Sequence, residues 1–102
     1  MRQVINIKTE KDLSELYAKK KKGTFNILYT SLWDESCQRL AKKVSEWQER
    51  EGDELLYVIN SWDTPAAFSM FMIMSAPSLV GITRGRVKVN VEFPTIYRYF
   101  EG

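Results

Sequence analysis

Apolar and polar residues recur along this chain in patterns that predict a regular series of strands and helices. Short alternating or continuous apolar runs indicate strands. They are expected at residues 3–7, 24–30, 54–60, 78–83 and 86–92. Apolar residues three or four positions apart indicate helices. They are expected from about residue 9 to near Gly23, at 35–50, at 66 to about 72, and in a last short helix that Pro94 opens. The predicted order is therefore βαβαβαββα.

The same patterns predict how these elements are layered. Residues 24–30 and 54–60 are almost continuously apolar, which is typical of strands covered on both faces. Residues 3–7 alternate, as expected of an edge strand, and Arg84-Gly85 between the last two strands indicates a hairpin. We therefore expect an α/β fold with a mixed central sheet and helices on both faces, formed by a single domain over residues 1–102.

The helix expected at residues 35–50 carries one apolar stripe at helical spacing. Its members are Cys37, Leu40, Ala41, Val44 and Trp47. Cys37 is the one cysteine of the chain, and this stripe places it on the face that turns to the core. We expect the thiol to be buried.

Two features of the composition exclude several kinds of chemistry. The chain has no histidine, which removes Ser-His and Cys-His nucleophile pairs and the most common metal ligand. With one cysteine it can form neither an intramolecular disulfide nor a Cys-rich zinc site. No group of Asp and Glu residues has convincing ligand spacing. We expect neither a metal nor a cofactor.

Charge and hydropathy narrow the choice of partners. The net charge of +2 is too small to indicate binding to nucleic acid or to an anionic membrane. Lysines 19–22 are best interpreted as a solvated helix end that complements the helix dipole. A less favoured interpretation is that they serve a nucleic-acid accessory role. Arg84, Arg86 and Lys88 are too scattered to form a second basic cluster. No apolar run approaches the ~20 residues of a membrane span, and no secretory leader is evident, so a cytoplasmic location is expected.

One motif resembles the active site of the thioredoxin family. Residues 33–37 read Trp-Asp-Glu-Ser-Cys at a junction of strand and helix, and Pro77 lies ahead of the last hairpin. Thioredoxins carry Trp-Cys-x-x-Cys at such a junction and a cis-proline in a second loop, and the order of elements is similar over almost the whole chain. The resemblance implies a thioredoxin-like fold in which Asp34 replaces the first, exposed cysteine. It also implies that Cys37 matches the second, largely buried cysteine and that the Ala76-Pro77 bond is cis.

Other parts of the thioredoxin redox machinery are missing as well. The buried carboxylate of the family would fall at Leu28, and its accompanying lysine would fall near Ile59. Ala76 stands before the proline where the family usually has Ile or Thr. The resemblance therefore implies a degenerate active site.

Asp34 and Cys37 each have a structural and a chemical interpretation. Asp34 is a good helix N-cap, whereas a role as general base has no acid partner in the motif. Cys37 is best read as a small buried hydrophobe, and the other interpretation is a monothiol nucleophile or redox sensor. Burial and the neighbouring carboxylates of Asp34 and Glu35 should raise the pKa of the thiol, which argues against catalysis.

One surface that the resemblance implies, a groove for binding a partner, needs no thiol. In thioredoxins the tryptophan and the cis-proline loop form a shallow groove that grips an extended partner. Here Trp33, Ala76 and Pro77 would form it, extended by Met74 and Phe93. Methionine and tryptophan supply adaptable apolar contact area of the kind used in partner recognition.

The other methionines of that region have a simpler interpretation. Met70 and Met72, with Met74 as the exception, favour core packing of a short helix. We predict a non-catalytic protein-binding module or subunit that takes a protein partner in an extended conformation. The alternative is a monothiol thioredoxin-like oxidoreductase or redox sensor acting through Cys37. The residues favour no enzymatic activity, and any activity would be thiol-disulfide exchange.

Overall fold

The computed structural model describes residues 2–20, 22–31, 33–69 and 71–101. Its elements along the chain are β1 (Gln3–Ile7), α1 (Glu10–Lys19), β2 (Phe25–Thr30), α2 (Glu35–Glu49), β3 (Leu55–Asn60), the 3-10 helix η1 (Pro65–Ser69), β4 (Ser78–Thr83), β5 (Arg86–Asn90) and α3 (Phe93–Glu101). The strands begin and end within two residues of the predicted bounds.

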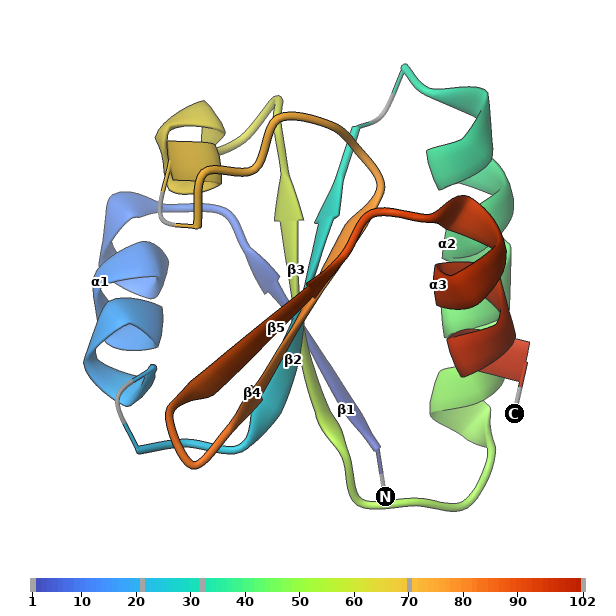
Figure 1. Ribbon diagram of the computed structural model, residues 1–102, viewed down its shortest axis with the longest axis horizontal. Coiled ribbons are helices and arrows are strands. Elements are labelled where there is room, and N and C mark those ends of the chain that lie inside the picture. Colours follow the sequence, from blue (N-terminus) through green and yellow to red (C-terminus); the bar gives the residue numbers. More distant parts are fainter. Residues whose placement is uncertain (1, 21, 32, 70, 102) are drawn as a thin grey trace.

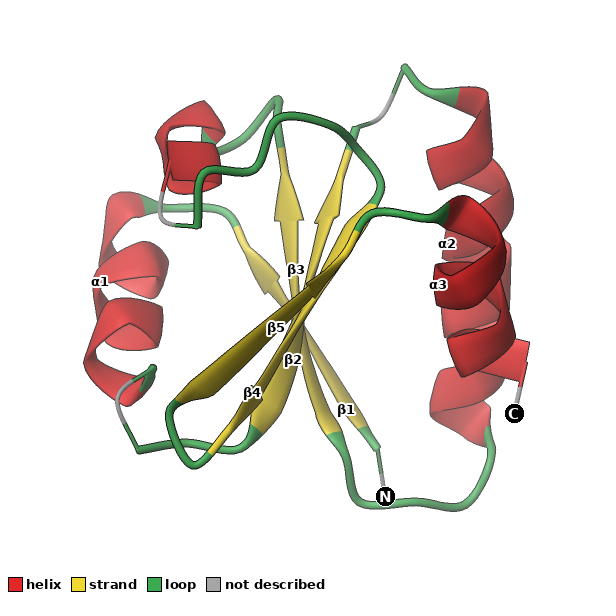
Figure 2. Ribbon diagram, in the orientation of Figure 1, coloured by secondary structure: helices red, strands yellow, loops and turns green. Residues whose placement is uncertain are grey.

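The strands form one mixed sheet. Its order is β1-β3-β2-β4-β5, so β1 is an edge strand as predicted. β1 and β2 both run parallel to β3, whereas β4 is antiparallel to β2 and β5 is antiparallel to β4. In Figures 1 and 2, α1 and η1 cover one face of this sheet, and α2 and α3 cover the other. The α/β fold class with helices on both faces is confirmed.

Each face of the sheet has its own apolar core, because successive strand residues point to opposite faces. Within β2, Ile27 and Tyr29 belong to the core under α1, where Leu16 is also buried. Leu28, between them, belongs to the core under α2 and α3. The continuous apolar sequence of β2 is thus explained by burial on both sides.

Three local signals in the sequence act as predicted. The Thr9 side chain accepts a hydrogen bond from the Asp12 amide while the Asp12 carboxylate accepts one from the Thr9 amide, which makes a capping box at the start of α1. Asp34 caps α2. Arg84 and Gly85 have φ values of 50° and 83°, the two positive values that a two-residue type I′ hairpin requires.

The helix α1 ends earlier than predicted. Its last residue is Lys19 rather than a residue near Gly23. The Lys22 and Gly23 amides both donate to the Lys19 carbonyl, so the chain closes a turn there and leaves the helix axis. The lysine run is therefore a helix end followed by a turn, and Lys21 lies outside the described residues.

The predicted helix at 66–72 is wrong in type and length, because this segment forms only the short 3-10 helix η1. The Ile73 amide donates to the Phe68 carbonyl at 2.8 Å, and the Met72 amide donates to the Ser69 carbonyl at 3.3 Å. With Met72 at a φ of 55°, this is the hydrogen-bond pattern of a Schellman ending. Met72 is consequently exposed, so its predicted core packing is also wrong, and Met70 lies outside the described residues.

Two further placements differ from expectation. Ala41 is exposed, although the rest of the predicted α2 stripe is buried. It lines a hollow that is bordered by residues of α2, β1, β2 and β3. Ile59, near which the resemblance places the family's lysine, belongs to the core under α1. The residue beside Leu28 in the sheet register is Val58.

Candidate functional site

The predicted site lies at the end of the sheet where β2 and β3 finish and β4 begins (Figure 1). β2 and β3 are parallel neighbours, with Thr30 opposite Asn60. Loops that follow parallel neighbours leave the sheet at the same edge, so Trp33 after β2 meets Trp62 after β3.

These two tryptophans form an exposed aromatic pair. Their ring centroids are 6.2 Å apart at an interplanar angle of 76°, an edge-to-face arrangement. Trp33 is 78% exposed and Trp62 is 67% exposed. The Asn60 side chain accepts a hydrogen bond from the Trp62 amide at 2.9 Å and fixes the turn that carries the second ring. Sequence reasoning missed Trp62, although its place directly after a strand parallel to β2 was a usable signal.

The loop between η1 and β4 carries two exposed methionines. Met74 is 94% exposed and Met72 is 83% exposed. Ala76 is half-buried, Pro77 is buried, and the peptide bond between them is cis. The large apolar side chains that this loop exposes are therefore its methionines, whereas the proline ring is buried.

Phe93 takes a different position from the one expected of a groove residue. It begins α3 and packs half-buried against the core under α2 and α3. Its ring lies 5.6 Å from the Tyr97 ring and 5.4 Å from the Arg39 guanidinium. The ring is therefore engaged within the fold, and a role for Phe93 in partner binding stays a prediction.

Asp34 stands at the start of α2 and acts there as a helix cap. Its Oδ1 accepts a hydrogen bond of 3.1 Å from the Cys37 amide, and its backbone is extended, as an N-cap requires. The Asp34 carbonyl accepts from the Gln38 amide, which is the first hydrogen bond of the helix. A carboxylate here also interacts favourably with the positive end of the helix dipole.

Cys37 lies one turn into α2 with its thiol against the sheet. The residue is 3% exposed, and its Sγ accepts a hydrogen bond of 3.4 Å from the Ser31 amide. Burial raises the pKa of the Cys37 thiol, and hydrogen bonds with Thr30 and Ser31 oppose that increase only in part. The Asp34 carboxylate raises the pKa further through its charge and its hydrogen bond.

The surroundings of the thiol are mostly apolar. Leu28, which stands where the resemblance implies a buried carboxylate, is 3% exposed and pairs with Val58 in the register of β2 and β3. A hollow of about 250 Å³ lies beside Cys37, between these strands and α2. Leu28 and Val58 carry no ionisable group, so neither of them can take a proton from the thiol.

The described residues include no metal-binding group and no helix that could span a membrane. Across residues 2–20, 22–31, 33–69 and 71–101, no group of three or more Cys, Asp or Glu residues is arranged to hold a metal ion. Within those same ranges, none of the helices combines the length and the apolar character of a membrane span.

Comparison with known proteins identifies the fold. No protein-family model matches this chain, and no curated protein matches its sequence. Among solved structures, the reduced thioredoxin pre-protein of Schistosoma mansoni superimposes with a TM-score of 0.76 at 17% identity, covering 97% of this chain and 96% of that one. Thioredoxin O2 of Arabidopsis thaliana in its oxidised state gives a TM-score of 0.78 at 16% identity, covering 96% and 91%. A thioredoxin of Nicotiana alata gives 0.77 at 12% identity, covering 96% and 90%.

These likenesses define the class of protein. The chain has a thioredoxin fold over nearly its whole length, as the motif at residues 33–37 and the order of elements predicted. At this level of sequence identity the likeness establishes the fold, and the chemistry has to be argued from the residues of this chain.

Proposed function

We propose that this thioredoxin-fold chain is a single-domain, non-catalytic protein-binding module. Its binding site is the Trp–Met surface, which we define as Trp33 and Trp62 on the loops after β2 and β3 together with Met72 and Met74 on the loop before β4. The observation that supports the proposal most directly is that these four large apolar side chains are each more than two-thirds exposed, at 67–94%. The one thiol of the chain is buried beneath them instead of lying among them.

The residues of the former redox site support this interpretation. A dithiol mechanism needs two cysteines, and the chain has one. Thiol-disulfide exchange needs a thiolate, whereas burial and the Asp34 carboxylate hold the pKa of Cys37 above its usual range. At the position of the attacking thiol, Asp34 supplies a helix cap and no nucleophile for a disulfide.

The Trp–Met surface has the chemistry of a recognition site. Tryptophan rings give large, rigid contact area, and methionine side chains adapt to the shape of a partner. The two rings already support each other edge to face, so little conformational freedom remains for Trp33 and Trp62 to lose on binding. We expect a partner segment in an extended conformation that places apolar side chains between the tryptophans and the methionines.

The proposal can be tested with a displayed library of random peptides selected on the whole chain. Peptides that bind should lose at least about tenfold in affinity in the double variant Trp33→Ala, Trp62→Ala, because tryptophan anchors commonly carry such a share of binding energy. Val87→Ala is the matched control, since Val87 is an exposed apolar residue on β5. Enrichment of peptides that bind the double variant equally well would contradict the proposal. So would turnover in an insulin-reduction assay that Cys37→Ser abolishes.

One observation favours a second candidate, a monothiol redox sensor. The Ser31 amide and the Thr30 side chain both hydrogen-bond the Cys37 sulfur, and each lowers its pKa. In this reaction the Cys37 thiolate would attack the disulfide of oxidised glutathione, form a mixed disulfide and release one glutathione thiolate. Mass spectrometry after incubation with oxidised glutathione should then show the adduct in the native chain. If Cys37→Ser leaves every oxidant-dependent property unchanged, this candidate fails.

A further inference from the structure

The end of the molecule opposite the loops of Trp33 and Trp62 gathers basic residues from two distant segments. The connection from α1 to β2 lies there beside the tip of the β4–β5 hairpin (Figure 1). The Gly85 amide donates to the Gly23 carbonyl at 3.4 Å, and the Arg84 amide donates to the Thr24 Oγ1 at 3.2 Å. Lys19, Lys20 and Lys22 and the hairpin arginines, which lie far apart in the sequence, are therefore parts of one basic end.

The cations of this basic end have no carboxylate partners in the described part of the chain. Ion pairs within 4 Å join only Arg2 to Glu54 and Lys43 to Glu46 there. Lys20 instead lies over the rings of Tyr17 and Phe71, at 5.5 and 5.9 Å, and Lys19 donates a hydrogen bond of 2.9 Å to the Tyr57 hydroxyl. Lys22, Arg84 and Arg86 are exposed. These positive charges are thus available to an anionic partner.

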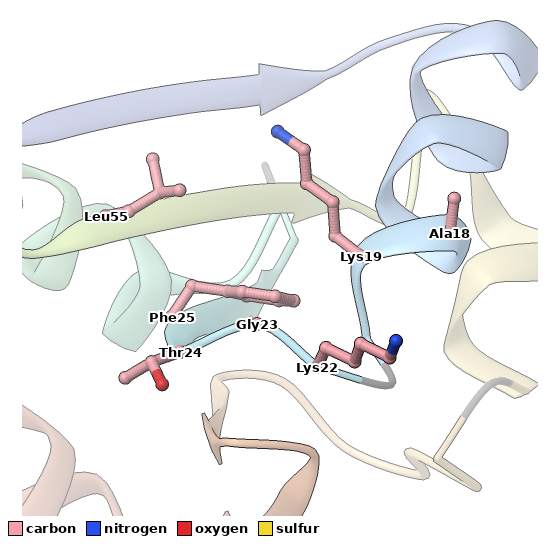
Figure 3. A pocket seen from close by; sticks show the side chains of 7 residues that line it. All are labelled: Ala18, Lys19, Lys22, Gly23, Thr24, Phe25 and Leu55. Atoms are coloured by element: carbon pink, nitrogen blue, oxygen red, sulfur yellow. The ribbon is translucent and has the colours of Figure 1, made fainter.

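Beside these cations is a hollow of about 560 Å³ with a mixed lining, which we call the lysine hollow (Figure 3). Its apolar lining is Ala18, Phe25 and Leu55, and its rim carries Lys19 and Lys22. In Figure 3 these two lysine side chains diverge from the neighbourhood of the Phe25 ring, and their amino groups point in different directions.

Gly23 allows the chain to pass close to the ring in this hollow. A Cβ atom at residue 23 would come within 2.6 Å of the Phe25 Cε1 and 2.9 Å of the Lys19 carbonyl oxygen. A side chain there would displace the ring or the end of α1. The hollow, its apolar lining and its lysine rim are therefore fixed by the backbone of this turn.

We propose that the lysine hollow binds an acidic segment of a protein partner that inserts one apolar side chain. Carboxylates of the segment would lie against Lys19, Lys22 and Arg84, and the apolar side chain would cover Phe25 and Leu55. Charge complementarity identifies the partner as acidic, since no described carboxylate pairs with these cations. The apolar lining favours a peptide segment over a small anion, because the half-buried Leu55 side chain offers apolar contact that an anion alone cannot use.

The same end of the molecule disfavours a nucleic acid. A second hollow shares Thr24, Phe25 and Leu55 with the lysine hollow and is lined by Asp53 and Glu54. A continuous phosphate backbone that crossed this end would meet those carboxylates, whereas a short acidic segment can stay on the lysine side. Nearby aromatic rings also offer little for base stacking, since Phe25 is buried and Lys20 already lies over Tyr17 and Phe71.

The test is a titration of the 15N-labelled full chain with a peptide that carries acidic residues on both sides of one central phenylalanine. Amide shifts should concentrate at Gly23, Thr24 and Phe25. Lys22→Glu and Arg84→Glu should each weaken binding about three- to tenfold, because each reversal replaces an attraction with a repulsion. Lys42→Glu is the control, because it makes the same change in net charge at an exposed residue of α2. It should change the affinity by less than about twofold. A peptide with serine in place of the phenylalanine should bind more weakly.

Three results would overturn this assignment. One is equal binding of a peptide in which lysines replace the acidic residues, and another is the absence of shifts at residues 23–25 at millimolar peptide. The third is tighter binding of poly(U) that displaces the peptide, which would make this end a nucleic-acid site. The proposed function is tested separately from this assignment, because the double variant Trp33→Ala, Trp62→Ala should leave binding of the acidic peptide unchanged.

Discussion

Iodoacetamide should label native Cys37 very slowly at neutral pH. The reacting form is the thiolate, and burial raises the pKa of Cys37 above its ordinary value of 9.0. A thiol of pKa 9.0 is ~1% ionised at pH 7, so the native chain should present less thiolate than that. Ionisation alone would therefore slow the reaction of this residue.

Restricted access of iodoacetamide to the sulfur slows the labelling of Cys37 further. The Cys37 residue is 3% exposed, so the reagent reaches the sulfur mainly when the structure opens. If opening requires global unfolding with a free energy of about 5 kcal/mol, the open fraction is on the order of 10⁻⁴. We therefore expect labelling at pH 7 to be about three to four decades slower in the native chain than in the unfolded chain.

The assay is mass spectrometry of the labelled fraction against time, from about pH 6 to about pH 10, with and without guanidinium. Asp34→Ala is an informative companion, because the Asp34 carboxylate raises the pKa of Cys37 and its removal should lower that pKa. Burial, the largest cause, remains in this variant, so labelling should still be slow. A native rate within about tenfold of the unfolded rate, with an apparent pKa below about 8.5, would refute the reasoning and make Cys37 a working thiolate.

Three further predictions concern stability and are measured by urea unfolding. Asp34→Ala should lower the free energy of unfolding by about 0.5–2 kcal/mol through loss of the cap to the Cys37 amide, whereas Asp34→Asn should retain most of it; equal losses would contradict the cap. The Arg2 guanidinium, which bonds Glu54 at 3.1 and 3.2 Å, lowers the pKa of that carboxyl below 4.5. A carboxyl group with a lowered pKa stabilises the fold at pH values above its pKa in the unfolded chain, and this stabilisation is lost as the pH falls through its pKa in the folded chain. The difference in the free energy of unfolding between the native chain and Glu54→Gln should therefore shrink from about pH 6 to about pH 3. A constant difference would exclude this linkage. Leu40→Ala should cost about 2–5 kcal/mol, since Leu40 is fully buried between α2 and the sheet, and a loss below about 1 kcal/mol would show that the site collapses.

The sequence predicted the order of elements because strand alternation, helix spacing and turn residues are local signals. Asp34 as a cap and Cys37 as a buried thiol followed from the same kind of spacing. Met72 was misplaced because a helix was expected where the chain turns through a left-handed residue. That turn depends on hydrogen bonds that form only once the segment packs over Tyr29 and its neighbours.

Features that depend on which strands become neighbours were not visible in the sequence. The pairing of Trp33 with Trp62 requires β2 and β3 to be adjacent and parallel. The joining of Thr24 to Arg84 requires two segments sixty positions apart to meet at one end of the sheet. Each could be inferred once the strand order was written down, since parallel neighbours end at the same edge and an antiparallel strand ends where its neighbour begins.

Asp34 and Leu28 support a non-catalytic role by independent physical arguments. At the start of α2, an Asp carboxylate gives the helix dipole the same kind of stabilisation as a thiolate, so the fold loses nothing when the nucleophile is absent. At Leu28, the argument concerns desolvation. A carboxylate buried beside Val58 would incur a desolvation penalty, whereas the leucine there contributes apolar burial. Leu28 and Val58 supply no proton acceptor for the sulfur, and the carboxylate that does hydrogen-bond the thiol, that of Asp34, raises its pKa. Neither Asp34 nor Leu28 promotes thiolate formation at Cys37, which supports the proposed non-catalytic role, while the exposed tryptophans offer a surface for a partner.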